Sequence, residues 1–241
     1  MKLNERALIG VATATVVSCA PAKNEYASYE LYPVRSGSLT EMEYTPEVTN
    51  FTLWAPTADE VRLMLFDAGD GGHAYETVSM VSDKEGTWTA KVEKDLIGKF
   101  YTFNVKIKDK WLGDTPGINA KAVGVNGKRA AIIDMRATDP EGWAQDKRPA
   151  LASPADAVIY EMHHRDFSID PSSGIQHKGK FLALTEEGTL SPEKLATGID
   201  HLKELGVTHV HILPSYDYAS VDETKLDENK YNWGYDPQNY N

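Results

Sequence analysis

The sequence predicts a multidomain protein with an all-β sandwich in its first half and a β-α-β unit in its second half. The sandwich is predicted by short segments in which apolar and polar residues alternate, with turn-forming residues between them. The β-α-β unit is predicted by a nearly continuous apolar run, which is typical of a strand in a parallel sheet, followed by a helix signal and a second strand-like run. A chain of 241 residues with 41% hydrophobic residues is long enough for more than one core.

Four segments of the first half have the alternation of strands that are buried on one face. Glycine, proline, aspartate and lysine cluster in the gaps between them and indicate turns. Strands of this length and spacing are typical of a sandwich. The segments cover residues 51–54, 61–66, 87–92 and 101–107, and the turns cover residues 55–57, 67–72, 84–86 and 97–99.

Two tryptophans lie in these strands, and one of the turns is rich in glycine and aspartate. We expect Trp54 and Trp88 to pack in the core, because a tryptophan in a small sandwich is more often buried than free to stack on a ligand. Asp67 and Asp70 lack the ligand spacing and the terminal glutamate of a calcium loop. We therefore predict a hairpin turn there.

The second half of the chain has the pattern of an α/β fold. Residues 156–162 are almost all apolar, which predicts a strand buried on both faces of a parallel sheet. Residues 207–213 predict the next strand, and a strand, a helix and a strand in this order form a right-handed crossover. The helix is predicted over residues 192–205, from Ser191 as N-cap and Pro192 at the first position, with an apolar stripe of Leu195, Ile199, Leu202 and Leu205 that ends at Gly206.

The N-terminus predicts a processed leader. Lys2 and Arg6 precede an uncharged stretch over residues 7–17 that is too short to span a bilayer, which needs roughly 20 apolar residues. The following Val-Val-Ser-Cys ends at the single cysteine, Cys19, and resembles the lipobox of bacterial lipoproteins. This implies a signal peptide over residues 1–19, lipid attachment at Cys19, a membrane contact through that lipid only, and a location in the bacterial envelope or outside the cell. The alternative is a cytoplasmic chain with an apolar start.

The charge of the chain restricts its partners. With 36 acidic and 25 basic residues, the formal net charge is −11. Such a surface repels phosphate backbones, so nucleic acid is not an expected partner. A neutral polymer such as an α-glucan is compatible with this charge.

Residues 231–241 combine aromatic rings with asparagine, aspartate and proline around one glycine. Flat aromatic faces cover the apolar faces of pyranose rings, and asparagine and aspartate offer hydrogen-bond partners for ring hydroxyls. The run Tyr-Asn-Trp-Gly-Tyr-Asp-Pro over residues 231–237 resembles the signature heptapeptide of type I pullulanases. These α-amylase-superfamily enzymes cut α-1,6 linkages in pullulan, starch and glycogen.

Other segments carry the same resemblance in register. Residues 51–57, 86–88 and 98–103 resemble an immunoglobulin-like, starch-binding-type module, although the Pro-Tyr-Ala usual near Pro116 is replaced by Pro-Gly-Ile-Asn. Residues 158–167, the predicted helix and the strand after it resemble the start of a (β/α)8 TIM barrel. The implied organisation is a linker or adapting strand over residues 20–45, the module over 46–140, a linker over 141–153 and an incomplete barrel over 154–241.

The resemblance also implies roles for residues of the motif. Tyr235 would stack under the sugar ring at the cleavage subsite, and Asn232, Trp233 and Asp236 would shape the wall of that subsite. In the module, Trp111 is a possible glucan contact. In a (β/α)8 barrel such loops follow the strands at the carboxyl end, where the active site lies.

The resemblance implies no catalytic residue in this chain. Glu161, Asp166 and Asp217 match structural positions, whereas the nucleophile, the acid/base and a third carboxylate of the family come from later barrel strands, beyond Asn241. We therefore expect the chain to be the N-terminal part of a retaining α-1,6-glucosidase that is inactive alone. The alternatives are a non-catalytic glucan-binding envelope lipoprotein and an isoamylase or branching-enzyme relative.

No metal site is predicted. A third ligand for zinc is not evident beside the histidine pairs, so we expect them to be buried and hydrogen-bonded. No cofactor is expected to be required, and the resemblance allows calcium without assignable ligands. The histidines concerned are His163, His164, His209 and His211.

Overall fold

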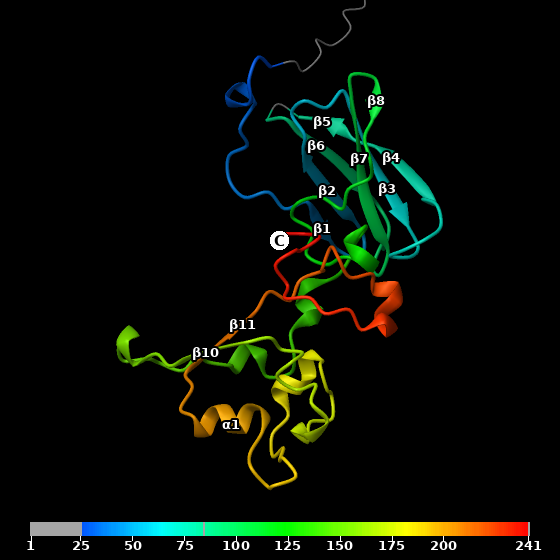
Figure 1. The fold of residues 1–241 in the computed structure, drawn as a ribbon. Coiled ribbons are helices and arrows are strands. Elements are labelled where there is room, and N and C mark those ends of the chain that lie inside the picture. The colour runs from blue at the N-terminus through cyan, green and yellow to red at the C-terminus, as the bar shows by residue number, and fades with distance from the viewer. Residues whose placement is uncertain (1–25, 84, 241) are drawn as a thin grey trace, which may run out of the picture.

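The computed structural model describes residues 26–83 and 85–240. The predicted signal peptide and Cys19 lie outside these residues. After a short 3-10 helix, η1 (Tyr29–Leu31), the chain forms a β-rich part, and from about residue 154 an α/β part. Figure 1 shows the β-rich part at the top and the α/β part below it, with the C-terminal segment, in red, between them.

Two antiparallel sheets form the β-rich part. The first has the order β1 (Met42–Tyr44), β2 (Thr49–Trp54), β6 (Thr87–Val92) and β5 (Val81–Ser82). The second has the order β4 (Glu76–Ser79), β3 (Glu60–Phe66), β7 (Phe100–Ile107) and β8 (Lys110–Trp111), and β9 (Ala130–Ala131) also pairs with β7.

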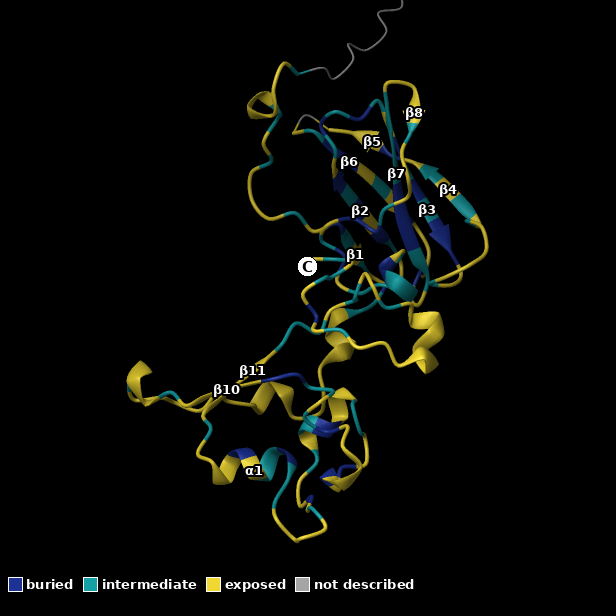
Figure 2. Ribbon diagram, in the orientation of Figure 1, coloured by how far each residue is buried: buried dark blue, intermediate teal, exposed yellow. Residues whose placement is uncertain are grey.

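The core of this part lies between the two sheets. Alternate residues of β2 and β3 are buried, as the period of two requires, whereas Tyr101, Thr102 and Phe103 of β7 are buried in succession. The ring of Tyr101 packs edge-on against Phe51, with centroids 5.1 Å apart, and against Phe103 at 5.4 Å. Figure 2 shows the buried residues concentrated in these strands. The sandwich prediction is therefore confirmed at the level of a sandwich-like β module.

The two strand tryptophans differ. Trp88 is buried, and its indole N–H donates to the carbonyl of Ala55 at 3.0 Å, as predicted for a core residue. Trp54 is 39% exposed, and its indole N–H donates to the carbonyl of Pro33. The core prediction for Trp54 was wrong, because the buried Leu53 precedes it in β2 and consecutive strand residues point to opposite faces.

The module includes residues before position 46. Strand β1 pairs with β2 from Met42 to Tyr44, inside the segment that the sequence indicated as a linker or an adapting strand. Glu41 is 1% exposed and accepts backbone N–H groups of Ile118 and Asn119 at 3.3 and 2.9 Å. Burial raises the pKa of this carboxyl group. The side chain of Glu41 thus fixes the loop that leaves the second sheet.

The predicted hairpin turn over residues 67–72 is confirmed. It joins β3 to β4, which are antiparallel neighbours. Gly71 and Gly72 have φ angles of +64° and +65°, which residues with a Cβ atom rarely adopt.

The α/β part contains two parallel strands, β10 (Ile159–Met162) and β11 (His209–Ile212), with Ile159 opposite His209. Between them in sequence lies α1 (Gly198–Glu204). The predicted order of strand, helix and strand is confirmed. In the described part of the chain these two strands form a sheet of their own, so no larger part of a barrel is seen. Short 3-10 helices complete the fold: η2 (Val125–Gly127), η3 (Met135–Thr138), η4 (Trp143–Gln145), η5 (Pro154–Asp156), η6 (Pro171–Ser173), η7 (Phe181–Thr185) and η8 (Glu223–Glu228).

The prediction that the strand over residues 156–162 is buried on both faces was wrong for this structure. Ile159 is 66% exposed and Val210 is 44% exposed, and in β10 only Met162 is buried. Figure 2 shows both strands largely in the colour of exposed residues. The apolar composition of residues 156–162 is that of a buried strand, but most residues of β10 and β11 are exposed.

The helix is shorter than predicted. It begins at Gly198, after the N-cap Thr197, instead of at Pro192. Lys194 has a φ angle of +65°, and a bridge between Leu190 and Ala196 holds the preceding residues in a turn. The hydroxyl group of Ser191 caps that turn by accepting the N–H of Glu193. None of the helices in the described residues is long and apolar enough to cross a membrane.

Candidate functional site

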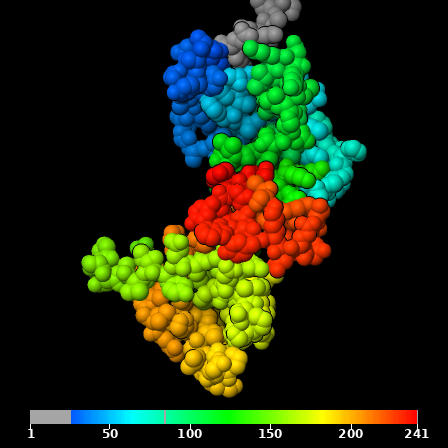
Figure 3. Space-filling view, in the orientation of Figure 1, coloured from blue at the N-terminus to red at the C-terminus, as the bar shows by residue number. Residues whose placement is uncertain are grey.

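The predicted sugar-binding segment, residues 231–240, lies between the module and the α/β part (Figures 1 and 3). Its end runs beside the residues that follow β11. The N–H of Gln238 donates to the carbonyl of Asp217 at 2.7 Å, and the N–H of Ala219 donates to the carbonyl of Asp236 at 2.8 Å. The side-chain amide of Asn239 reaches the carbonyl of Gly127 in the module.

Asn232 and Asp236 organise the loop. The amide group of Asn232 donates to Asp236 Oδ1 at 2.6 Å and to the hydroxyl group of Ser220 at 2.7 Å. The oxygen of the same side chain accepts the N–H of Gly234. Asp236 also accepts the N–H of Ser220, and these hydrogen bonds lower the pKa of its carboxyl group. The polar residues that were predicted to shape a sugar-binding wall therefore bind one another and fix the backbone of the loop.

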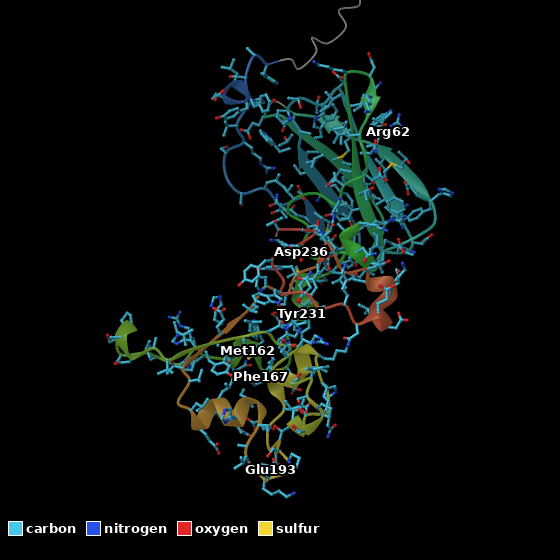
Figure 4. The ribbon with its side chains drawn as sticks, in the orientation of Figure 1. Arg62, Met162, Phe167, Glu193, Tyr231 and Asp236 are labelled. Carbon is cyan, nitrogen blue, oxygen red and sulfur yellow. The ribbon has the colours of Figure 1, made fainter. Side chains whose placement is uncertain are left out.

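The end of β10 holds the beginning of the loop. His163 is buried, and its Nε2 lies 2.8 Å from the carbonyl oxygen of Asn232. The ring of Tyr231 stacks on His163 with centroids 5.4 Å apart, and its hydroxyl group donates to Asp166 at 2.9 Å. Arg165 pairs with the same carboxylate at 3.0 Å. Figure 4 shows Tyr231 and Asp236 close together, between the two parts of the chain.

The aromatic rings at the centre of the motif remain free. Tyr235 is 65% exposed and Trp233 is 63% exposed. Gly234 between them is buried with a φ angle of +90°, and a Cβ atom there would overlap the carbonyl group of Pro214. The loop can approach the end of β11 this closely because residue 234 has no side chain. The result is a fixed backbone that presents two aromatic side chains to solvent.

A cleft of about 470 Å³ lies beside this loop. It is lined by residues of the segment after β10 and of the segment after β11. Asn232 lines it, whereas Tyr235, Trp233 and Asp236 do not. Two exposed aromatic residues that the sequence analysis did not single out, Phe181 and Tyr216, also line it.

The module and the α/β part meet through a reciprocal set of hydrogen bonds. In η2, the side-chain amide of Asn126 donates to Asp222 at 3.0 Å and its backbone N–H donates to the carboxylate of Glu223 at 2.7 Å. The backbone N–H of Glu223 donates in return to the side-chain oxygen of Asn126. The hydrogen bonds from Asn126 and Thr224 lower the pKa of Asp222 to about 2.

Asp217 lies at the same junction. Burial raises the pKa of its carboxyl group, the nearby charge of Glu223 raises it further, and a hydrogen bond with Asn239 lowers it. Gly127 has a φ angle of +63°, and a Cβ atom on it would meet the side chains of Asn239 and Asp217. This glycine permits the close approach of the two parts.

Comparisons with known proteins agree with this architecture. Residues 40–124 match the family model for carbohydrate-binding module 48, described as the isoamylase N-terminal domain. A pullulanase of Bacillus subtilis is 39% identical over 198 residues, which is 82% of this chain and 26% of the relative. This chain is a pullulanase-type sequence.

Solved structures give the same result. The pullulanase of Paenibacillus barengoltzii, solved without ligand, has a TM-score of 0.85 and 53% identity, over 90% of this chain and 33% of that one. The pullulanase of Bacillus acidopullulyticus has a TM-score of 0.81 and 42% identity, over 88% of this chain and 26% of that one. The pullulanase-type chain thus spans about a quarter to a third of the length of these relatives.

Trp111, the predicted glucan contact in the module of this pullulanase-type chain, lies away from the loop. Its ring is half-buried in β8, and the guanidinium group of Arg62 covers one face at 3.9 Å from the ring centroid. Figure 4 shows Arg62 at the opposite end of the module from Asp236. The structure therefore does not bring Trp111 together with Tyr235.

The histidines have different environments. His163 is buried as expected, but His209 and His211 are exposed on β11, so that part of the prediction was wrong. His211 Nδ1 lies 3.2 Å from the carboxylate of Glu161 on β10. Within residues 26–83 and 85–240, no group of three or more His, Cys, Asp or Glu side chains could hold a metal ion.

Proposed function

We propose that this chain is the N-terminal part of a glycoside hydrolase that cleaves α-1,6-glucosidic linkages in pullulan, starch or glycogen with retention of configuration. The observation that carries the proposal is the loop over residues 231–237, whose backbone is fixed while Tyr235 and Trp233 remain exposed. A rigid aromatic face is suited to stack on a pyranose ring and loses little entropy on binding.

An α-glucan is the proposed ligand of both parts of the chain. The pullulanase of Paenibacillus barengoltzii has been crystallised with maltohexaose and α-cyclodextrin, and a point mutant of it with maltotetraose. In this chain, Tyr235 would stack on the sugar at the cleavage subsite, and Asn232 and Asp236 would hold the loop that carries it. Trp111, which Arg62 and Lys106 approach, would contact a glucan at the far end of the module. The net charge of −11 favours this neutral ligand over nucleic acid.

The catalytic carboxylates are proposed to come from later strands of a barrel that begins with β10 and β11. Retaining hydrolysis uses two carboxyl groups about 5 Å apart. Three carboxylates near the loop have structural partners instead: Asp166 binds Tyr231 and Arg165, Glu161 lies beside His211, and Asp217 is half-buried beside Asn239. The exposed apolar faces of β10 and β11 are the faces that further strands and helices would cover.

We also propose that Cys19 receives a lipid and attaches the protein to the bacterial envelope. The support is the sequence Val-Val-Ser-Cys after an uncharged stretch. Growth with a radioactive fatty acid should label the wild-type protein and leave Cys19→Ser unlabelled. Labelling of both proteins, or of neither, would contradict the attachment at Cys19.

The glucan-binding part of the proposal is tested by calorimetric titration of the chain with maltotetraose. Tyr235→Ala should weaken binding roughly tenfold, because an aromatic anchor at the centre of a site contributes more than about 1 kcal/mol. Trp143→Ala is the control, since Trp143 is 57% exposed in η4 and has no part in the site. The same preparations should release no reducing ends from pullulan. If the chain does not bind maltotetraose, the glucan-binding proposal is refuted. If the chain hydrolyses pullulan, the proposal that the catalytic carboxylates come from later strands is refuted.

A further inference from the structure

The cleft beside the loop is lined by two exposed aromatic side chains that come from distant segments. Phe181 belongs to η7, and Tyr216 follows β11. Their side chains are 61% and 57% exposed, although both line the same cleft of about 470 Å³. This volume falls within the range of small-molecule sites in proteins, about 300–1,000 Å³.

One face of Phe181 is supported and the other is free. His164 stacks on the phenyl ring with centroids 4.6 Å apart and an angle of 15° between the planes. His163 stacks on His164 at 5.7 Å and 8°, and Tyr231 stacks on His163 at 5.4 Å and 25°. This column of four rings ends on the loop that carries Tyr235. Because His164 covers one face of Phe181 and most of its side chain is exposed, the other face is available to a ligand.

The polar groups of the cleft suit a neutral ligand with many hydroxyl groups. Asn229 and Asn232 line it, and the side-chain amide of Asn232 is already hydrogen-bonded to Ser220, Asp236 and Gly234. The amide nitrogen of Asn229 is the group that can donate a hydrogen bond to a ligand. Two of the cationic side chains in the cleft are already paired with carboxylates. Arg165 pairs with Asp166 at 3.0 Å, and Lys225 lies 3.7 Å from Asp222. A polyanion would have to replace these pairs, whereas a sugar need not.

We propose that this cleft is an α-glucan subsite in which a glucosyl ring stacks on the free face of Phe181 and Tyr216 forms the facing wall. The inference rests on the proposed function, because it takes the same class of ligand, and it assigns that ligand to residues outside the heptapeptide. A sugar on Phe181 would be connected to the loop with Tyr235 through the column of rings. Occupancy of the cleft would therefore favour the ordered form of that loop.

The test uses the full chain labelled with 4-fluorophenylalanine. The sequence contains 6 phenylalanines, so the fluorine NMR spectrum should contain six resonances. The resonance of Phe181 is the one that is absent from the spectra of Phe181→Leu and Phe181→Tyr. Two variants are made so that the assignment still stands if one of them does not fold. On titration with maltotetraose, the Phe181 resonance should shift and saturate. Phe181→Ala should weaken binding at this subsite roughly tenfold, as for an aromatic anchor.

Leu182→Ala is the matched control. Leu182 is the next residue of η7 and is 58% exposed, but it does not line the cleft. Its substitution should leave the affinity unchanged. If calorimetry shows that maltotetraose binds while the Phe181 resonance does not move, or if both alanine variants bind alike, the subsite is refuted and the proposed function stands. If the chain binds no maltotetraose at all, the glucan-binding function itself fails.

Discussion

Gly234→Ala should release the candidate loop from the end of β11. Gly234 has a φ angle of +90°, and adding a Cβ atom at positive φ costs about 1–2 kcal/mol. The added atom would also lie 2.7 Å from the carbonyl carbon of Pro214, well inside normal contact. Overpacking of this kind costs about 1–3 kcal/mol. The sum is about 2–5 kcal/mol, taken from the free energy that keeps the loop ordered.

Hydrogen exchange followed by mass spectrometry measures this effect directly. A loss of about 2–5 kcal/mol lowers protection roughly 30-fold to several-thousand-fold, up to the limit set by the stability of the loop. The decrease should appear in peptides that contain the N–H groups of Ser220, Gly234 and Gln238, which are hydrogen-bonded in the loop.

Gly206→Ala separates the two contributions to this cost. Gly206 follows α1 with a φ angle of +72°, and no neighbour lies within 4 Å of its Cβ position. Gly206→Ala should therefore lose only the backbone contribution of about 1–2 kcal/mol of local stability, and the loss should appear in peptides around α1. Equal losses in the two variants would refute the steric reasoning, and so would unchanged exchange in residues 214–238 of Gly234→Ala.

Three further predictions concern the module and its junction. Burial raises the pKa of Glu41, so this carboxyl group binds its proton more tightly in the folded state than in the unfolded state. The contribution of Glu41 to the free energy of unfolding should therefore fall as pH rises above 4.5. Urea unfolding between pH 4 and 7 should show this fall in the wild type, and Glu41→Gln should lack it. The carboxylate of Asp222, with its pKa lowered to about 2, should stabilise the junction with Asn126 above pH 3.8 and cease to do so as pH falls toward 2. The NMR resonance of the Asn126 side-chain amide should report this change. A resonance that does not depend on pH, or the same change in Asp222→Asn, would contradict the prediction. Phe51→Ala should lower the free energy of unfolding in urea by about 3–5 kcal/mol, because Phe51 is fully buried. Trp54→Ala, on the outer face of the same strand, should lower it by about 1 kcal/mol or less. Similar losses in the two variants would contradict the assignment of the two faces.

Local patterns predicted the elements in which one face is buried. The alternation of residues 51–54 matches β2, which buries one face in the core. Residues 101–107 lie in β7, but Tyr101, Thr102 and Phe103 are buried in succession there, so burial does not follow the alternation. Strand β5 has only two residues, which is too short for any period to be recognised. At Ser191 and Pro192 the local signals are those of a helix start, yet the bridge from Leu190 to Ala196 makes a turn there. Tertiary contacts decided the outcome at that point.

The sequence predicts which residues of the heptapeptide belong to the candidate site, but it does not predict the long-range contacts that bring other residues to it. The aromatic and amide content of residues 231–237 indicates the site, and Tyr235 and Trp233 of this motif are exposed. The contact of His163 with Asn232 joins positions 69 residues apart, which no local pattern can indicate. The same is true of Phe181 and Tyr216, because a single exposed aromatic residue has no signature until folding brings it beside another.

The junction made by Asn126, Asp222 and Glu223 determines how the module can assist the loop. A glucan chain held by the module would remain tethered near Tyr235, because these hydrogen bonds fix the orientation of one part against the other. The second contact then becomes an intramolecular event, and its effective concentration depends on geometry instead of on the bulk amount of glucan. Long glucans that reach both parts should therefore gain avidity, whereas short oligosaccharides that reach only one should not.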